Sequence, residues 1–121
     1  MPTPSRTSLE EIVAAGRSVL TRDGAPGLTM QRVAEAVGVR APSLYKHVPS
    51  RSALLRLVTE DVIADLTRRL EAAASTGDPA LDLRALAVTL REFALNDPHG
   101  FELLFTPLPP DAMAKATYVG H

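Results

Sequence analysis

The stretch GVRAPSLYKHVPSR, Gly38 to Arg51, decides how this sequence is interpreted. It sets an aromatic side chain directly beside two basic ones, at Tyr45, Lys46 and His47, although only 4% of the chain is aromatic. The chain is otherwise rich in Ala, Leu and Val, and 45% of all residues are hydrophobic. Charged side chains are rarely buried in a packed core, so the stretch predicts a surface that faces a partner.

Two short helices are expected around this stretch. Thr29 is a suitable N-cap for the first helix, and Gly38 ends it because glycine readily adopts the left-handed backbone conformation. Pro42 suits the first turn of the second helix, and Pro49 closes that helix by disfavouring helical geometry at the preceding residue. The first helix carries apolar residues at helical spacing, namely Met30, Val33, Ala34 and Val37. Two helices joined by a tight glycine turn form a helix-turn-helix.

The remaining sequence predicts further helices. Ser8 and Glu11 form a capping-box pattern at the start of a helix that ends at Gly24. Ser50 caps a longer helix that ends near residue 75, and Asp78 begins another that ends at the Asn-Asp-Pro sequence of residues 96–98. A short helix follows, with apolar positions at Phe101, Leu104 and Phe105. No segment shows the sustained alternation of a strand, so the expected fold class is all-α.

Positive charge is concentrated in the first half of the chain. Residues 1–70 hold ten Lys/Arg against seven Asp/Glu, a net charge of +3, whereas residues 71–121 hold three against seven, a net charge of −4. Residues 29–58 contain five basic side chains and a single acidic one, Glu35. A local basic surface on a nearly neutral chain suggests an anionic partner for one face, although an ordinary solvated surface has the same signature.

Several classes of protein fit this sequence poorly. No apolar run approaches the ~20 residues that span a bilayer, and the first residues, MPTPSRTS, lack the apolar segment of a signal peptide. The absence of cysteine fits a cytoplasmic protein. We find no nucleophile with a base, no paired carboxylates, no phosphate loop and no metal-ligand cluster, since His99 is isolated. We therefore expect no enzyme activity, no metal, no cofactor and no membrane partner.

The second short helix has the character of a DNA-reading surface. Val39 and Leu44 are expected to anchor it, and the side chains around them to project outward. A polar, basic helix fits the DNA major groove, which is about 12 Å wide. Thr29 and Arg51, at the starts of flanking helices, can reach phosphates on either side. The predicted DNA-binding residues are Thr29, Arg40, Ala41, Pro42, Ser43, Tyr45, Lys46, His47 and Arg51, with Gly38 as the turn.

These residues carry a family resemblance. Residues 28–55 resemble the DNA-binding region of the tetracycline-repressor (TetR) family of regulators, in the sequence VAEAVGV at residues 33–39 and in SLYKHV at residues 43–48, followed by Arg51 and a Leu pair. Val48 stands where the family more often has Phe, and Arg51 where it more often has Lys. With the leading helix, the resemblance covers roughly residues 6–65.

The resemblance implies a fold and a function. It implies a three-helix DNA-binding domain at residues 6–66 and, at 67–121, part of a helical regulatory domain. It further implies a homodimeric regulator, by family default a repressor, that binds a palindromic operator and responds to a small-molecule effector. Residues 90–105 resemble the start of the regulatory domain, and its candidate effector contacts are Phe93, Phe101 and Phe105. Because family members are usually much longer, this chain is either part of a longer protein or an unusual short member, and we expect the former.

Other interpretations of the same residues remain open. Arg40 and Lys46 fit free surface charges, Tyr45 fits packing at the edge of the core, and His47 fits a packed, hydrogen-bonded histidine. A helical module that binds proteins through a helix-turn-helix scaffold is the main functional alternative, and a steep salt dependence would distinguish DNA binding from it. LacI-like repressors share a VAEAVGV-type sequence but place it at the very N-terminus, whereas here a whole helix precedes it.

Overall fold

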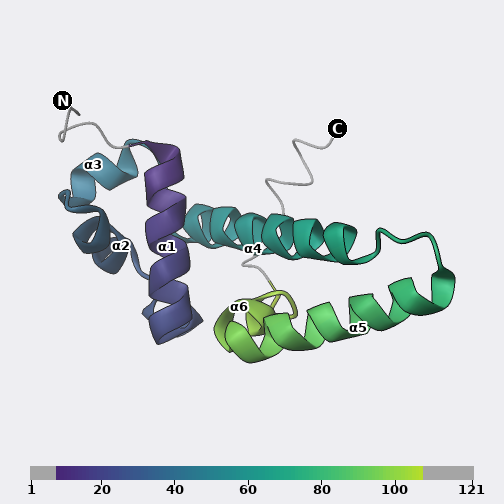
Figure 1. Cartoon of the computed structure of the whole chain (residues 1–121). Coiled ribbons are helices and arrows are strands. Elements are labelled where there is room, and N and C mark those ends of the chain that lie inside the picture. The colour runs from purple at the N-terminus through teal and green to yellow at the C-terminus, as the bar shows by residue number, and fades with distance from the viewer. Residues whose placement is uncertain (1–7, 108–121) are drawn as a thin grey trace.

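The computed structural model describes residues 8–107, and this part of the chain is helical without any β-strand (Figure 1). The expected all-α fold class is confirmed. A single-turn 3₁₀ helix, η1, lies between the first two α-helices. In chain order the elements are α1 (Leu9–Asp23), η1 (Ala25–Gly27), α2 (Met30–Val37), α3 (Ala41–Tyr45), α4 (Arg51–Ala73), α5 (Pro79–Asn96) and α6 (Pro98–Leu103).

Side-chain caps set where the helices begin. Ser8 forms both bonds of the capping box, because its Oγ accepts from the Glu11 amide at 3.1 Å and its amide donates to Glu11 Oε1 at 3.0 Å. The Thr29 hydroxyl oxygen accepts from the third amide of α2, and the Ser50 hydroxyl oxygen accepts from that of α4. Asp78 accepts from the first amides of α5. The four predicted helix starts are therefore confirmed, since each cap satisfies amides that lack a partner within the helix.

The structure differs from the sequence-based boundaries near two prolines. The helix expected to close at Pro49 already ends at Tyr45, and residues 46 and 47 continue as a turn in which the amides of His47 and Val48 both donate to Leu44 O. The last helix begins at Pro98, three residues before the first apolar position of the pattern. Here Asp97 acts as the N-cap by accepting from the Gly100 amide at 3.0 Å, and such a cap overrides the apolar pattern.

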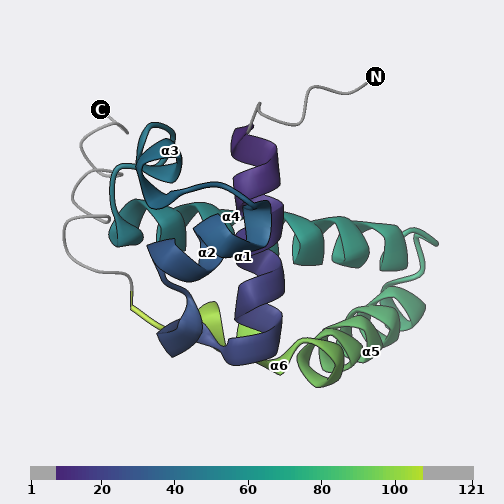
Figure 2. The same cartoon turned by 90° about the vertical axis from the view of Figure 1, so that its left-hand side faces the viewer.

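The core forms around α1, which packs against α2, α4 and α6 (Figure 2). Helices α1 and α4 cross closely at Gly16, where an added Cβ would lie 2.7 Å from Val58 Cγ2. Burying one such Val or Leu side chain contributes about 1.5–3 kcal/mol. The largest fully buried side chains are Ile12, Val19, Leu20, Leu28, Val33, Leu44, Val48, Leu54, Val58 and Val62. All of them lie within α1 to α4, so this core holds the helix-turn-helix rigidly.

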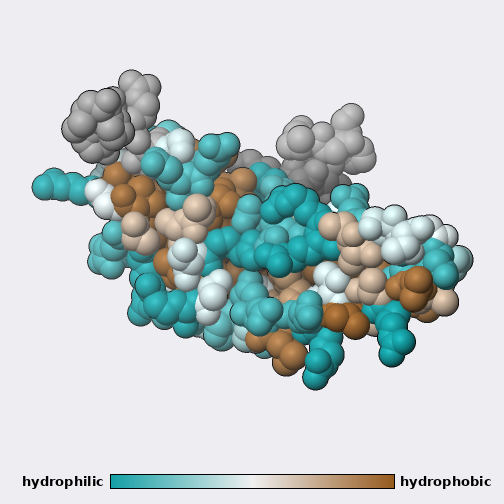
Figure 3. Space-filling view, in the orientation of Figure 1, coloured by the Kyte–Doolittle hydropathy of each residue, from teal (hydrophilic) through white to brown (hydrophobic). Residues whose placement is uncertain are grey.

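Helix α4 extends out of this core, and α5 returns alongside it as the second arm of a hairpin (Figure 1). Phe93 is the buried residue of α5, and it lies near the end of the helix that approaches α6. Several large apolar side chains of α5 stay exposed, among them Leu83 at 69% and Leu95 at 64%, and hydrophobic groups are visible on the surface over α5 (Figure 3). The predicted domain boundary between residues 66 and 67 falls inside the continuous helix α4 and stays a prediction.

Replacing Gly38 should destabilise the fold through its backbone alone. Gly38 has φ 91° and ψ 30°, in the left-handed region, and an added Cβ would meet no atom within 4 Å. Gly38→Ala should therefore cost about 1–2 kcal/mol of unfolding free energy, measured by urea denaturation monitored by circular dichroism. Gly38→Asn is the matched control, because Asn tolerates this conformation better, and it should cost less. Equal stability of the Ala variant and the parent would contradict the assigned turn.

Candidate nucleic-acid interface

Helices α2 and α3 form the predicted helix-turn-helix. The amides of Gly38 and Val39 both donate to Ala34 O, at 2.9 and 3.0 Å, which closes the end of α2 and turns the chain. Leu44 in α3 and Val48 after it are fully buried. These two side chains fix one side of α3 to the core, and α3 lies at the outer end of the bundle (Figure 1). The opposite side of α3 therefore faces away from the core in a fixed orientation.

The structure brings most of the predicted DNA-binding residues together on α3 and its two flanking turns. Ala41 and Ser43 are half-buried, whereas Tyr45 exposes 49% of its surface. The predicted residues that are exposed there are Arg40, Pro42, Tyr45, Lys46 and His47. A short segment thus presents two cationic side chains, an imidazole and a phenol to solvent.

The basic side chains of this segment are unpaired, unlike most others in the molecule. Within residues 8–107, no hydrogen bond or ion pair to another protein group engages the side chains of Arg40, Lys46 or His47, and the same holds for Arg84 and Arg91 on α5. Most other arginines bind carboxylates or carbonyl oxygens, namely Arg17, Arg22, Arg32, Arg51, Arg56, Arg68 and Arg69. An unpaired cation loses no protein contact when it binds a phosphate or a base edge, so the α3 segment suits an anionic partner.

Thr29 and Arg51 flank this segment and have structural roles. The Thr29 hydroxyl oxygen caps α2. Arg51 Nε donates to Leu28 O and its Nη2 donates to Ala25 O, both at 2.8 Å, so the first residue of α4 holds the loop before α2. The sequence predicts a phosphate contact for Arg51 but gives no sign of this internal role, because its acceptors lie 23 and 26 residues earlier in the chain. The DNA contacts of both residues stay predictions.

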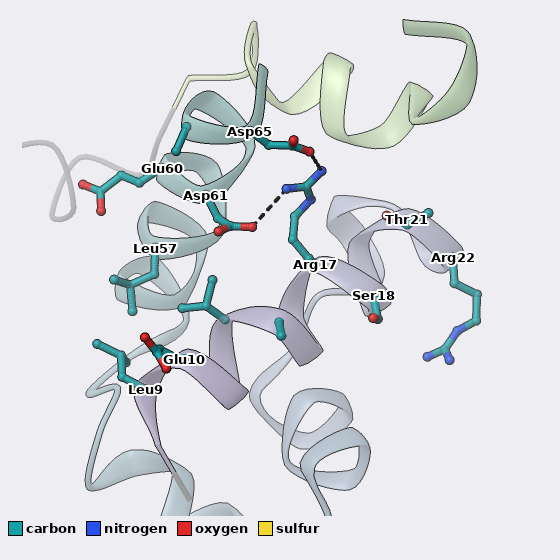
Figure 4. Close-up of a pocket in the computed structure, with 13 residues that line it drawn as sticks. Leu9, Glu10, Arg17, Ser18, Thr21, Arg22, Leu57, Glu60, Asp61 and Asp65 are labelled. Carbon is teal, nitrogen blue, oxygen red and sulfur yellow. Dashed lines mark hydrogen bonds and ion pairs between the residues drawn. The ribbon is translucent and has the colours of Figure 1, made fainter. Parts of the chain in front are cut away.

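An ion cluster around Arg17 was not foreseen. The guanidinium of Arg17 on α1 lies 3.0 Å from an oxygen of Asp61, 3.2 Å from Asp65 and 3.1 Å from Asp97. Figure 4 shows Arg17 reaching from α1 to Asp61 and Asp65 on α4. The i,i+4 spacing of these two aspartates was the one local signal for the cluster. It could not reveal the partner, which lies 44 and 48 residues away.

Arg17 and Asp65 of this cluster favour their charged forms. Burial opposes the charged form of Arg17, but hydrogen bonds to its three carboxylate partners outweigh burial and raise the pKa of Arg17. Burial also opposes the charged form of Asp65 and would raise its pKa. Hydrogen bonds from Arg69 and Arg17 instead hold the pKa of Asp65 below its ordinary value. Asp65 therefore stays ionised at neutral pH, and its attraction to Arg17 is present throughout the physiological range.

Two hollows lie beside the cluster. One of about 920 Å³ is lined by residues of α1 and α4, with apolar side chains such as Leu9, Val13 and Leu57 beside the Arg17 cluster (Figure 4). Another of about 640 Å³ lies between α1, α4 and α5 and is bordered by Phe93. Of the other two aromatic residues predicted to contact an effector, Phe101 packs against the core and Phe105 is 73% exposed. The three rings thus do not converge on one cavity, and their effector role stays a prediction.

Over residues 8–107, no three His, Cys, Asp or Glu side chains gather as metal ligands would. In the same range, no helix combines the length and apolar character needed to cross a bilayer.

The N-terminal helices are similar to those of a known protein family. Residues 6–58 match the profile described as "Bacterial regulatory proteins, tetR family". This segment belongs to the TetR family. An HTH-type transcriptional regulator of Saccharopolyspora erythraea is 32% identical over 112 residues, which make up 91% of this chain and 46% of that protein. The tetracycline repressor of class E from Escherichia coli is 28% identical over 60 residues, 50% of this chain and 28% of the repressor.

Solved TetR structures have the same fold. A TetR variant from Acinetobacter baumannii, crystallised in complex with minocycline, superposes with a TM-score of 0.66 at 25% identity, over 86% of this chain and 58% of that one. The TetR-family regulator PfmR from Thermus thermophilus superposes with a TM-score of 0.63 at 23% identity, over 94% of this chain and 63% of that one. The expected TetR-type helix-turn-helix is thereby confirmed. This chain spans about half the length of the curated relatives that match it over most of its length.

Removing the Arg51 side chain should lower stability before any DNA is present. Arg51→Ala loses two charge-assisted hydrogen bonds to loop carbonyls, for an expected loss of about 1–2 kcal/mol in the free energy of unfolding. Arg51→Lys should recover only part of that loss, since one ammonium cannot reproduce the forked geometry. Urea denaturation measures both variants. Arg56→Ala is the control, because the exposed Arg56–Glu60 pair contributes about 0.5 kcal/mol or less. An Arg51→Ala variant as stable as the parent would leave phosphate binding as the residue's only role.

Proposed function

We propose that this chain contains the DNA-reading head of a sequence-specific transcriptional regulator, with α3 in the major groove. One observation carries the proposal. The unpaired basic groups of Arg40, Lys46 and His47 lie next to exposed Tyr45. The helix that presents them is fixed to the core by buried Leu44 and Val48. Membership of the TetR family and the similarity to named transcriptional regulators support it.

The geometry of the segment suggests how contacts are divided. A helix of ordinary width fits the major groove, and residues in its first turns face base edges while flanking groups hold phosphates. Arg40 at the start of α3 can pair with a guanine edge, and Lys46 at its end can reach a phosphate. Tyr45 can donate its hydroxyl hydrogen to either. Thr29, at the N-terminus of α2, is placed for the phosphate on the other side.

The wider assembly is also a proposal. A single head of this size touches few base pairs, so we infer that two copies bind a palindromic operator about one helical turn apart. Repression with a small-molecule effector is the mode that the similarity to tetracycline repressors supports. The relative solved with minocycline supports effector binding, and we infer that the site lies in the helices that follow the head. The hollow beside Phe93 is the candidate start of that site.

Replacing Tyr45 and Lys46 together by Ala should weaken DNA binding without unfolding the chain. Both side chains are exposed, so the helical circular dichroism should stay unchanged. We expect a loss of about 2–4 kcal/mol, from one base-edge and one phosphate contact. The probe is a duplex selected from a random library by the unaltered chain, titrated by fluorescence anisotropy at several salt concentrations. Loss of the Lys46 contact should also reduce the slope of log affinity against log salt by about 1.

The matched control removes two unpaired cations from α5. Arg84→Ala with Arg91→Ala changes the net charge by more than the test variant does but leaves α3 intact, so its affinity should stay close to that of the parent. Equal losses in both variants would mean that total charge, and no specific surface, attracts DNA. If the parent selects no duplex at all, the chain is a helix-turn-helix module that binds another kind of partner.

The exposed apolar side chains of α5 should drive association of this chain. Leu83→Glu with Leu95→Glu replaces two of them, exposed at 69% and 64%, with charges. The parent should sediment faster as its concentration rises, because large exposed apolar patches favour contact, whereas the double variant should depend less on concentration. Thr67→Glu with Ala80→Glu adds the same charge without removing a large apolar side chain, and should behave as the parent. A parent that stays monomeric at every concentration contradicts the prediction.

A further inference from the structure

The hollow between α1 and α4 has an apolar end that is open to solvent. Leu9 and Val13 of α1 and Leu57 of α4 line it, and Figure 4 shows Leu9 and Leu57 on the same side of Arg17. Leu9 exposes 43% of its surface, so water contacts apolar atoms that a ligand can cover. The volume of about 920 Å³ lies within the ~300–1,000 Å³ of common small-molecule pockets. This α1–α4 hollow therefore has the size and the apolar surface of a ligand site.

Carboxylates surround the apolar end. Glu10 and Glu60 lie on the same side of Arg17 as the apolar residues (Figure 4). Within residues 8–107, no hydrogen bond or ion pair engages the side chain of Glu10, and that of Glu60 pairs only with Arg56. The side chain of Asp61 is 42% exposed and uses one of its two oxygens for Arg17. Because a carboxylate accepts several hydrogen bonds, all three groups keep capacity for a further donor.

The cations that line the hollow do not offset these carboxylates at the apolar end. Arg17 is bound to three aspartates. Arg22 lies on the opposite side of Arg17 from Leu9 (Figure 4) and pairs with Asp23. A positively charged ligand is therefore attracted to the apolar end, whereas a negatively charged one is repelled.

The hollow is formed before any ligand enters. Ala14 of α1 and Ala64 of α4 both line it and are exposed, and their short side chains leave the space between the helices unfilled. The close crossing at Gly16 and the ion pairs of Arg17 with α4 fix its two walls. A site that exists before binding loses less conformational entropy when a ligand enters.

We propose that the α1–α4 hollow binds an organic cation, a molecule with an apolar body and an ammonium group. The body lies against the apolar end, and the ammonium is stabilised by the carboxylates of Glu10, Glu60 and Asp61. The hollow beside Phe93 shares Arg17 with this site but lacks its apolar end, so the two sites differ. The proposal does not depend on DNA binding.

Three probes of equal chain length test the role of charge. Decylammonium is the cationic probe, decanol the neutral one and decanoate the anionic one, each titrated into the unaltered chain by isothermal titration calorimetry below its micelle concentration. Decylammonium should bind saturably and about 3- to 10-fold more tightly than decanol, because exposed charge contacts contribute modestly. Decanoate should bind most weakly. Equal affinity for the three probes, or binding that does not saturate, overturns the proposal.

Two pairs of substitutions separate the local carboxylates from total charge. Glu10→Gln with Glu60→Gln should remove most of the preference for decylammonium over decanol. Glu71→Gln with Glu102→Gln changes the net charge equally at exposed residues outside the hollow, so it should leave the preference intact. Equal losses in both double variants would mean that the cation is attracted by the whole chain and would overturn the site.

A filled hollow tests the apolar contact. Ala14→Trp should weaken binding of both decylammonium and decanol, whereas Ala87→Trp adds the same side chain at an exposed residue of α5 and should bind as the parent does. Circular dichroism checks that each variant is folded. If Ala14→Trp is not folded, the probe series and the charge variants decide the outcome. Full binding by a folded Ala14→Trp variant contradicts the proposal.

Amide chemical shifts locate the probe. In two-dimensional NMR spectra of the ¹⁵N-labelled chain, decylammonium should shift the amides of residues 9–14 of α1 and 57–61 of α4 most. Shifts that gather on α5 would place the probe on exposed apolar side chains or beside Phe93, and would overturn the site. Shifts of the α1 and α4 amides on dilution without probe would mean that a second copy occupies the hollow, which also overturns it. The proposed function stands in each of these cases, because no DNA is present.

Discussion

The close crossing of α1 and α4 at Gly16 is the constraint on which the rest of the structure depends. Glycine inside a helix costs about 0.5–1 kcal/mol relative to Ala, and here it is offset by the direct packing of Val58 and its neighbours against α1. Because α1 also carries α2 and α6, the crossing sets the relation of all other helices. A bulkier residue at this point would separate α1 from α4, and α3 would lose its support.

The basic side chains differ in what they contact. Arg17 and Arg51 bind carboxylates or carbonyl oxygens and hold the bundle in shape. Arg40, Lys46 and His47 of the α3 segment bind no protein group within residues 8–107. The net negative charge of residues 71–107 disfavours phosphates along α5 and α6. Under the proposed function, DNA is therefore attracted mainly to the α3 segment.

The hairpin of α4 and α5 stands apart from this rigid end. It buries little along α5 apart from Phe93, and it exposes apolar side chains over much of its length. Its near end is nevertheless attached to the head through α6 and Arg17. A long helix that belongs to the core at one end and to the hairpin at the other can pass a displacement between them.

Much of the fold could be predicted from short-range patterns. The caps at Ser8, Thr29, Ser50 and Asp78, and the turn at Gly38, depend on residues within three or four positions of each other, so the sequence by itself determined the helices and the helix-turn-helix. Together with the basic α3 segment, they also pointed to DNA. The pairing of Arg17 and the loop contacts of Arg51 were decided only by the tertiary structure. Their partners lie 23 to 80 residues away in the chain, and helix packing alone brings them within hydrogen-bond distance.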